Sequence, residues 1–510
     1  MPHGPMPGRG QHPAVSTRRV GYLTIPMRPL LTLSLSLVLA CGSPPPAGPP
    51  DIILVSMDTL RADRLGAYGN EAGLTPNLDH FAAEATVFDD AWAVANETLY
   101  SHGAAFTSRY TTETGPIFDT FRLAGGCPTL AEVLAVYGYD TAGFTGGGHL
   151  GPEFGLGRGF STWKVSQGWG SLYHSVPDAL RWLDARASEE PFFLFVHGYD
   201  THHRYLKPGP WGLAHVRADQ EGAGPRAARG NLGTVQMVDG WYFPRMNPPD
   251  LLDFRALRVH GPGERRRIER LARRKDIGAE PVTQDDIDYV RGIYDGAVGY
   301  GDAWFGLFMS ALERRGVLER AVVVLMSDHG EELGEDGLFH HRYSLSDLTL
   351  RVPLMVRLPG GEGGGRHVPG QVDLNDVMPT LLEAAGAAPP AGIRGRSLWP
   401  ALHGSALPDH PVSFSQTMFR AVSARASDGR VTFTGIDADS PFLADLIRAT
   451  PLAEPAFLVT AGMPPSRQEE LRLALADWAD GLAQPTAAGA AGPSPDQIET
   501  LREQGYWGTP

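Results

Sequence analysis

The sequence is poor in cysteine and has no apolar run long enough to cross a bilayer. Cys41 and Cys127 are the only cysteines among 510 residues, so a fold held together by several disulfides is excluded. The apolar run at residues 30–40 is much shorter than the roughly 20 residues that a membrane-spanning helix needs. An apolar content of 42% and a charged content of 20% exclude a disordered chain. They predict a globular protein large enough for more than one domain.

Acidic residues outnumber basic ones beyond the N-terminal segment. The formal net charge is −14, and residues 1–40 contain four arginines and no acid, so the rest of the chain carries −18. An acidic surface argues against nucleic acid as a partner, because it repels phosphates. It does not exclude a local pocket for a small anionic substrate.

The N-terminal residues are typical of an export signal. Three arginines precede the apolar run, which ends at Cys41 and is followed by a proline-rich stretch. Residues 38–41, Val-Leu-Ala-Cys, resemble a bacterial lipobox, in which the cysteine becomes lipidated. We therefore expect residues 1–40 to be a signal peptide and Cys41 to anchor an exported protein to a bacterial membrane, in the periplasm or at the cell surface. The alternative is a plain secretory signal with an incidental cysteine.

Strand-like and helical patterns alternate between a Pro/Gly linker at 41–50 and residue 404. This alternation predicts an α/β fold with a mostly parallel sheet covered by helices on both faces. Residues 208–280 are polar and poorly periodic, and we interpret them as an insertion at the rim of the site or a variable loop without a role. Residues 405–510 predict a smaller C-terminal subdomain. The predicted strands are Asp51–Met57, Asp140–Phe144, Phe192–Val196, Val322–Met326 and Pro353–Leu358, and the predicted helices are Leu78–Glu84, Thr129–Tyr137, Asp178–Arg186, Asp285–Leu312, Asn375–Ala384 and Ser494–Glu503.

Two short apolar runs each end in metal-binding side chains. Residues 51–57 precede Asp58, and residues 321–326 lead to Asp328 and His329. Such runs are typical of buried parallel strands, whose carboxyl ends meet at the ligand-binding edge of a sheet. Carboxylate and imidazole together predict a divalent metal, and the nitrogen ligand favours Zn²⁺ or Mn²⁺ over Ca²⁺ or Mg²⁺.

Three acids follow the second run closely. Glu331, Glu332 and Glu335 are interpreted as a solvated acidic turn, with a supporting role beside the metal as the alternative.

A series of ordered motifs resembles the sulfatase family. Residues 57–69, Met-Asp-Thr-Leu-Arg-Ala-Asp-Arg-Leu-Gly-Ala-Tyr-Gly, resemble its opening motif. This similarity, which spans nearly all of the chain after the linker, implies an alkaline-phosphatase-superfamily fold and a metal-dependent site for sulfate, phosphate or phosphonate esters. The further motifs are Thr75–Asp79, Gly159-Phe160, Phe192–Tyr205, Ser327–Glu335, Arg351–Leu354, Gly395–Leu398 and Leu501–Tyr506.

The chain departs from the family at the nucleophile. Aligning Thr107–Arg109 with the family's Thr-Gly-Arg places Thr98 where the family has the Cys or Ser that becomes formylglycine. Tyr100 then replaces a proline, and His102 replaces an arginine. Threonine cannot become formylglycine, but phosphoethanolamine and glycerol-phosphate transferases of the superfamily use it. The resemblance thus implies Thr98 as nucleophile and fourth metal ligand, and His102 as a substrate-binding residue.

Further histidines match functional positions of the family. His202 matches a substrate-binding histidine with a part in catalysis, and His341 matches the position that protonates the leaving oxygen. His149 matches an anion contact in a glycine loop where the family's lysine is Gly147. Asp200 is expected to orient His202 or to join a second metal.

These observations predict an exported metal-dependent hydrolase of sulfate or phosphate/phosphonate esters. An unmodified threonine favours phosphoesters, because a sulfated formylglycine is released by elimination from its hydrate and threonine lacks that route. Candidate substrates are small anionic esters, glycans or lipids. Two alternatives remain open: an envelope transferase of a phospho-group, and a non-catalytic protein that binds anions in the same pocket.

Overall fold

The computed structural model describes residues 48–482 except 115–121, 124, 167, 204, 206, 218–283, 336–338, 342–343, 408–409, 411, 418–420, 435–442 and 455. The predicted signal peptide, Cys41, most of the predicted insertion and the predicted helix at 494–503 lie outside the described residues.

The centre of the fold is an eight-stranded sheet with the strand order β10-β2-β9-β6-β1-β5-β3-β4. All neighbouring strands are parallel except β9, which runs antiparallel to both β2 and β6. The sheet is therefore mixed but mostly parallel, as predicted. Its strands are β1 (Asp51–Met57), β2 (Thr86–Trp92), β3 (Asp140–Thr145), β4 (Thr162–Val165), β5 (Phe192–Gly198), β6 (Ala321–Met326), β9 (Leu354–Arg357) and β10 (Arg366–Asp373).

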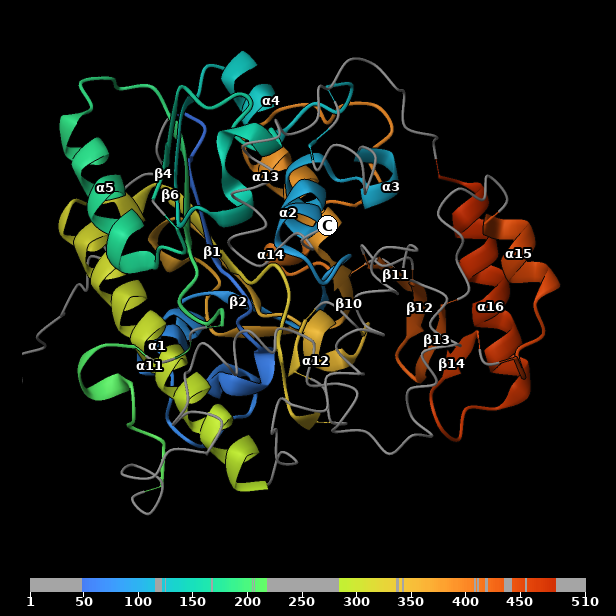
Figure 1. The fold of residues 1–510 in the computed structure, drawn as a ribbon. Helices are drawn as coiled ribbons and strands as arrows, with labels where there is room; N and C mark the ends of the chain where they lie inside the picture. Colours follow the sequence, from blue (N-terminus) through green and yellow to red (C-terminus); the bar gives the residue numbers. More distant parts are fainter. Residues whose placement is uncertain are drawn as a thin grey trace, which may run out of the picture. The chain divides into compact units, whose positions relative to one another are not determined.

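Helices cover both faces of this sheet (Figure 1). Side chains alternate along β1: Ile52 and Leu54 join the core on one face, whereas Ile53 and Val55 join the core on the other. This alternation explains why the strand is apolar throughout. The first face carries α2 (Thr98–Thr107), α4 (Leu130–Val136), α13 (Val377–Ala384) and α14 (Trp399–Leu402), and the second carries α1 (Pro76–Ala83), α5 (Leu172–Ala185) and α11 (Gln284–Arg314).

Short elements complete the main sheet region. Strands β7 (Glu332–Leu333) and β8 (Phe339–His340) form a small hairpin, and α3 (Thr111–Thr114) and α12 (Asp347–Leu350) are single turns. None of the helices within the described ranges is both long and apolar enough to cross a membrane.

A second, antiparallel sheet follows the main one in the chain. Its order is β11-β12-β13-β14, and it packs with two helices around a core of its own. A bridge between Ala95 and Gln416 and an ion pair between Arg425 and Asp347 join it to the main sheet region. Its elements are β11 (Ser413–Gln416), β12 (Val422–Ala426), β13 (Gly429–Phe433), β14 (Phe457–Val459), α15 (Leu443–Ala449) and α16 (Pro465–Asp480).

Long apolar elements match the sequence prediction closely, whereas polar ones do not. Strand β1 has the predicted bounds, and α11 differs from its prediction by one or two residues at each end. Helix α5 begins six residues before the predicted Asp178, because Ser171 and His174 form a capping box ahead of Pro177. Helix α2 and strands β2, β4 and β10 were not predicted.

Candidate active site

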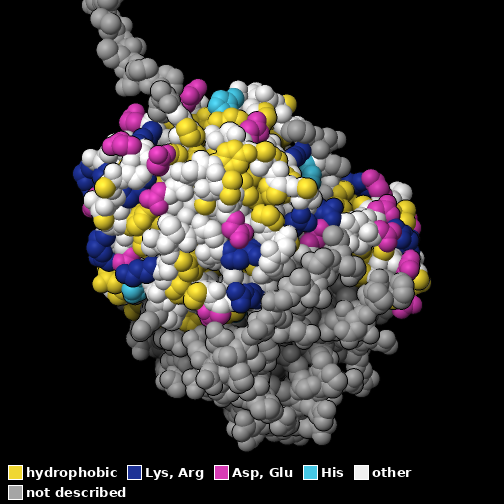
Figure 2. Space-filling view, turned by 90° about the horizontal axis from the view of Figure 1, so that it is seen from above, with side chains coloured by type: hydrophobic (Ala, Val, Ile, Leu, Met, Phe, Trp, Pro, Cys, Tyr) yellow, Lys and Arg dark blue, Asp and Glu magenta, His cyan; other side chains and the backbone are white. Residues whose placement is uncertain are grey.

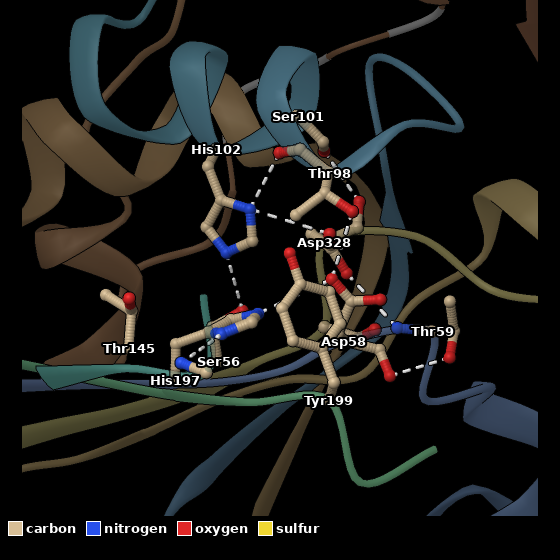
Figure 3. A network of polar contacts seen from close by, with 12 residues as sticks. Ser56, Asp58, Thr59, Thr98, Ser101, His102, Thr145, His197, Tyr199 and Asp328 are labelled. Atoms are coloured by element: carbon tan, nitrogen blue, oxygen red, sulfur yellow. Dashed lines mark hydrogen bonds and ion pairs between the residues drawn. The ribbon is translucent and has the colours of Figure 1, made fainter. Parts of the chain in front are cut away.

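The predicted metal ligands meet at the carboxyl edge of the main sheet. Strands β1 and β6 are parallel neighbours, and Ser56 pairs with Met326, so the residues that follow each strand lie side by side. Asp58, Asp328 and His329 are fully buried, and each offers a ligand atom within 4.8 Å of the others. Figure 3 shows the two carboxylates facing each other below helix α2.

The carboxylates and the imidazole present buried atoms without hydrogen bonds. These atoms are Asp58 Oδ1, Asp328 Oδ2 and His329 Nε2. Burial and the neighbouring Asp328 carboxylate raise the pKa of Asp58 well above its usual range. Buried polar atoms that lack partners carry a high desolvation cost, which a shared cation removes. The donor set therefore fits a divalent metal ion.

Neighbouring groups fix the orientation of Asp328 and His329. Asp328 Oδ1 accepts hydrogen bonds from the backbone N–H groups of Thr59 (3.2 Å) and His329 (3.0 Å). His329 Nδ1 lies 3.0 Å from the carbonyl oxygen of Gly330 and donates to it, which leaves Nε2 as the lone-pair nitrogen. Asp328 Oδ2 and His329 Nε2, 3.4 Å apart, thus remain for a shared ligand.

Thr98 is the first residue of α2, and the helix places it above the two carboxylates. Its Oγ1 donates to Asp58 Oδ2 over 3.1 Å. All ten residues of the helix are buried, and the helix ends at Ser108 with a left-handed φ of 53°. The unbonded N–H groups of a first helical turn favour negative charge beside them. Thr98 therefore lies where a developing anion is stabilised.

His102 lies one turn further along α2 and bonds to the backbone of Thr98. Its Nδ1 donates to the carbonyl oxygen of Thr98 (2.8 Å), and its Nε2 lies 2.9 Å from Ser56 Oγ. Its ring contacts His197, whose Nε2 is 3.4 Å from Asp58 Oδ2. Burial lowers the pKa of both histidines and so favours their neutral forms. These contacts connect His102 to helix α2 and strand β1.

His341 lies beside the predicted metal ligands and is oriented by an acid. Its Nδ1 is 2.8 Å from Glu331 Oε1, and its ring centroid is 4.3 Å from that of His329 and 5.4 Å from that of His202. Glu331 is fully buried, and Glu332 is buried with hydrogen bonds from Ser344 and Ser346. The interpretation as a solvated turn is therefore wrong for Glu331 and Glu332. The β7–β8 hairpin brings Glu331, just before β7, beside His341, just after β8, and the sequence did not predict this contact.

His202 is held by an aromatic residue that the sequence did not indicate. Its ring stacks on Trp169, with centroids 4.8 Å apart and planes 4° from parallel. Trp169 also contacts His149 and Tyr199, at centroid distances of 6.4 and 4.6 Å. Trp169 thus lies between the two histidines that the sequence assigned to substrate binding.

The glycine loop that carries His149 has no space for the family's lysine. Gly147 has a φ of +91°, and a Cβ atom there would lie 2.4 Å from the carbonyl oxygen of Gly168. Both properties demand glycine at this position. The local backbone therefore requires glycine at the position where the family has lysine.

Asp200 has a structural contact in the loop after β5. Its Oδ2 accepts a hydrogen bond from the backbone N–H of Leu172 at the start of α5, over 2.8 Å. Burial raises the pKa of Asp200 to about 6. Asp200 thus ties the loop after β5 to the start of α5.

Comparison with known proteins identifies the family. The sequence model of the sulfatase family matches residues 50–387, about two thirds of the chain. The chain belongs to the sulfatase family. It is 26% identical over 425 residues to an N-acetylglucosamine-6-O-sulfatase of Bacteroides thetaiotaomicron, covering 73% of this chain and 74% of that protein. It is 25% identical over 392 residues to an arylsulfatase of Clostridium perfringens, covering 68% and 77%.

Solved structures share the fold of this sulfatase-family chain. One is a protein in complex with its substrate D-glucosamine-2-N,6-O-disulfate, with a TM-score of 0.61, 22% identity, and coverage of 85% of this chain and 98% of that one. Another is the phosphonate monoester hydrolase of Agrobacterium radiobacter, with a TM-score of 0.58, 20% identity, and coverage of 76% and 88%. The predicted fold class, a mostly parallel sheet between helices with a smaller C-terminal sheet, is confirmed.

Proposed function

We propose that this sulfatase-family hydrolase cleaves phosphate or phosphonate esters through Thr98. The observation that carries the proposal is the 3.1 Å hydrogen bond from Thr98 Oγ1 to Asp58 Oδ2, at the start of α2. It holds an unmodified hydroxyl at the position that the family uses for its nucleophile. Phosphonate monoester hydrolases are among the proteins that share the fold, which is consistent with this chemistry.

The buried ligand set supports a metal-dependent reaction. Asp58, Asp328 and His329 would hold a divalent ion together with Thr98, and the imidazole favours Zn²⁺ or Mn²⁺. When bound, such an ion neutralises the two carboxylates and makes a neighbouring hydroxyl more acidic. The protein's own part is to orient Thr98, through Asp58 on its oxygen and His102 on its carbonyl.

The histidines beside Thr98 are placed to move protons. Glu331 fixes the tautomer of His341 by accepting from its Nδ1, so that Nε2 is the nitrogen that exchanges a proton with the substrate. We assign the protonation of the leaving alcohol to His341. His202, held flat against Trp169, contacts the anionic group and assists the water that releases phosphate from Thr98.

Sulfate esters are the second candidate substrates. The curated relatives named above are sulfatases. Their names refer to a sulfated sugar and to aryl sulfates, so these two classes of ester are the sulfates to test. The experiment is a panel of an aryl sulfate, a phosphate monoester, a phosphodiester and a phosphonate monoester, assayed with the parent chain, Thr98→Ser and Thr98→Ala. We expect phosphoester turnover by the parent and by Thr98→Ser, and none by Thr98→Ala. Turnover of the sulfate alone would replace this proposal by sulfatase activity.

Export and lipidation at Cys41 belong to the same proposal. They are supported by the basic residues, the short apolar run and the Ala40-Cys41 junction. Fractionation of bacteria that express the chain tests them, because Cys41→Ser should move the protein from the membrane fraction to the soluble fraction.

A further inference from the structure

An exposed apolar patch lies at the edge of the sheet opposite the active site. Strands β1, β3 and β5 are parallel, so the residues that precede them share the amino edge. Helix α4 ends there at Val136, whose side chain is 84% exposed, and the next residue, Tyr137, is 45% exposed. Isolated exposed apolar residues are ordinary, but a group of them on one face indicates an interaction site.

The patch is built from two segments that a hydrogen bond holds together. The Tyr137 hydroxyl accepts from the backbone N–H of Ala388, which brings the loop after α13 beside the end of α4. Ala135, Ala388 and Pro389 are also exposed, so Val136 and Tyr137 have apolar neighbours. Figure 2 looks onto the face at the top of Figure 1, where α4 lies, and shows a group of hydrophobic side chains on this face with acidic and basic side chains beside and around it. We name Ala135, Val136, Tyr137, Ala388 and Pro389 the amino-edge patch.

The N-terminal tether begins beside this patch. The hydroxyl of Tyr139, two residues after Tyr137, donates to the carbonyl oxygen of Pro50 over 2.9 Å. Nine residue steps separate Cys41 from Pro50, and an extended chain of that length spans at most about 30 Å. A lipid on Cys41 would therefore hold the amino edge close to a bilayer surface.

We propose that the amino-edge patch rests on the bilayer to which a lipidated Cys41 ties the chain. The patch supplies a tyrosine and small apolar groups, which suit the interface between head groups and acyl chains. Because Asp58, Asp328 and Thr98 lie at the opposite, carboxyl edge of the sheet, the active site opens toward the aqueous side. Soluble esters and glycans, rather than lipids of the same bilayer, then reach Thr98. The proposal rests on the lipidation proposed above, and its test does not.

The test replaces the natural lipid on Cys41 with a lipid that is attached chemically. The residues that the structure describes all belong to one compact unit, which does not include residues 1–45, so the chain from Cys41 onward is the protein to use. Its Cys41 thiol is coupled to a maleimide lipid in phosphatidylcholine vesicles. Cys127 is buried, and burial raises the pKa of its thiol, so it stays unmodified. Hydrogen exchange is then compared between the tethered chain and the free chain mixed with the same vesicles.

We expect slower exchange on tethering at residues 133–139 and 386–391, and unchanged exchange in the C-terminal sheet. Val136→Asp should lose this protection. Leu458→Asp, which changes an equally apolar side chain that is 59% exposed on β14, should keep it. Equal exchange in the tethered and free chains, or protection confined to other regions, would overturn the proposal. These outcomes require neither natural lipidation nor catalytic activity.

Discussion

Strand β1 carries a buried carboxylate at each end, and the two carboxylates have opposite surroundings. Asp51, at the amino end, accepts from the backbone N–H of Phe192 (3.1 Å) and forms an ion pair with Arg320 (2.6 Å). Asp58, just past the carboxyl end, faces a second carboxylate, Asp328, and keeps one oxygen without a hydrogen bond.

This difference indicates that Asp51 stabilises the fold, whereas Asp58 is available to bind a ligand. Both residues flank the same apolar run and are equally buried, so position and burial do not distinguish them. Their partners do: Asp51 has a cation within the protein, whereas Asp58 has a like charge beside it, which a bound cation compensates. Substitutions at the two ends of β1 should accordingly affect different properties.

The largest expected effect follows from Asp58→Asn. Loss of a metal ligand should lower turnover on the order of 10³-fold or more and abolish metal retention. With a chelator present, the variant should unfold at a higher temperature than the parent, because a repulsive pair of carboxylates is gone. Metal analysis, kinetics and thermal unfolding measure the three properties. Asp51→Asn is the matched control, and it should keep both metal and activity.

The next effect concerns the proton donor. His341→Gln should lower kcat by about 10²–10³-fold for an ester with a poor alkyl leaving group. The loss should be much smaller for a p-nitrophenyl ester, whose leaving oxygen needs no proton. Equal losses for both esters would show that His341 does not act as the general acid.

Glu331→Gln should have a smaller effect in the same direction. Glu331 touches His341 and acts through it, so we expect a loss of about 10- to 100-fold that again depends on the leaving group. Glu332→Gln is the matched control, since this neighbouring buried acid is bonded to Ser344 and Ser346. Combining Glu331→Gln with His341→Gln should add little to the loss from His341→Gln alone.

The smallest effect is on the pH dependence of stability. Burial raises the pKa of Asp51 to about 6, although Arg320 opposes the shift. The folded chain therefore holds a proton that the unfolded chain has lost between about pH 4 and 6, and the free energy of unfolding falls as the pH rises through this window. Asp51→Asn should make the dependence less steep, with kcat unchanged. Urea unfolding at several pH values measures this, and an unchanged slope would refute the assignment.

The sequence predicted the fold and the meeting of Asp58 with Asp328, because apolar runs and the residues that follow them are local signals. β1 and β6 are bounded by turns, and parallel strands bring Asp58 and Asp328 to one edge. Helix α2 was missed because Gly103, Ser101 and two threonines give it little helical propensity, and its complete burial supplies the stability instead. Trp169 was missed, and a supporting role for Glu331 was kept only as the alternative, because tertiary contacts alone bring these residues to His202 and His341.

The most direct test of the account is the covalent state of Thr98. The parent chain is incubated briefly with a phosphate or phosphonate ester, quenched in acid and digested for mass spectrometry. The account predicts one added phosphoryl or phosphonyl group on the peptide that contains Thr98, more of it in the His202→Ala variant, and none in Thr98→Ala. Steady turnover of the ester with no modified Thr98 peptide in either the parent or His202→Ala would contradict the account.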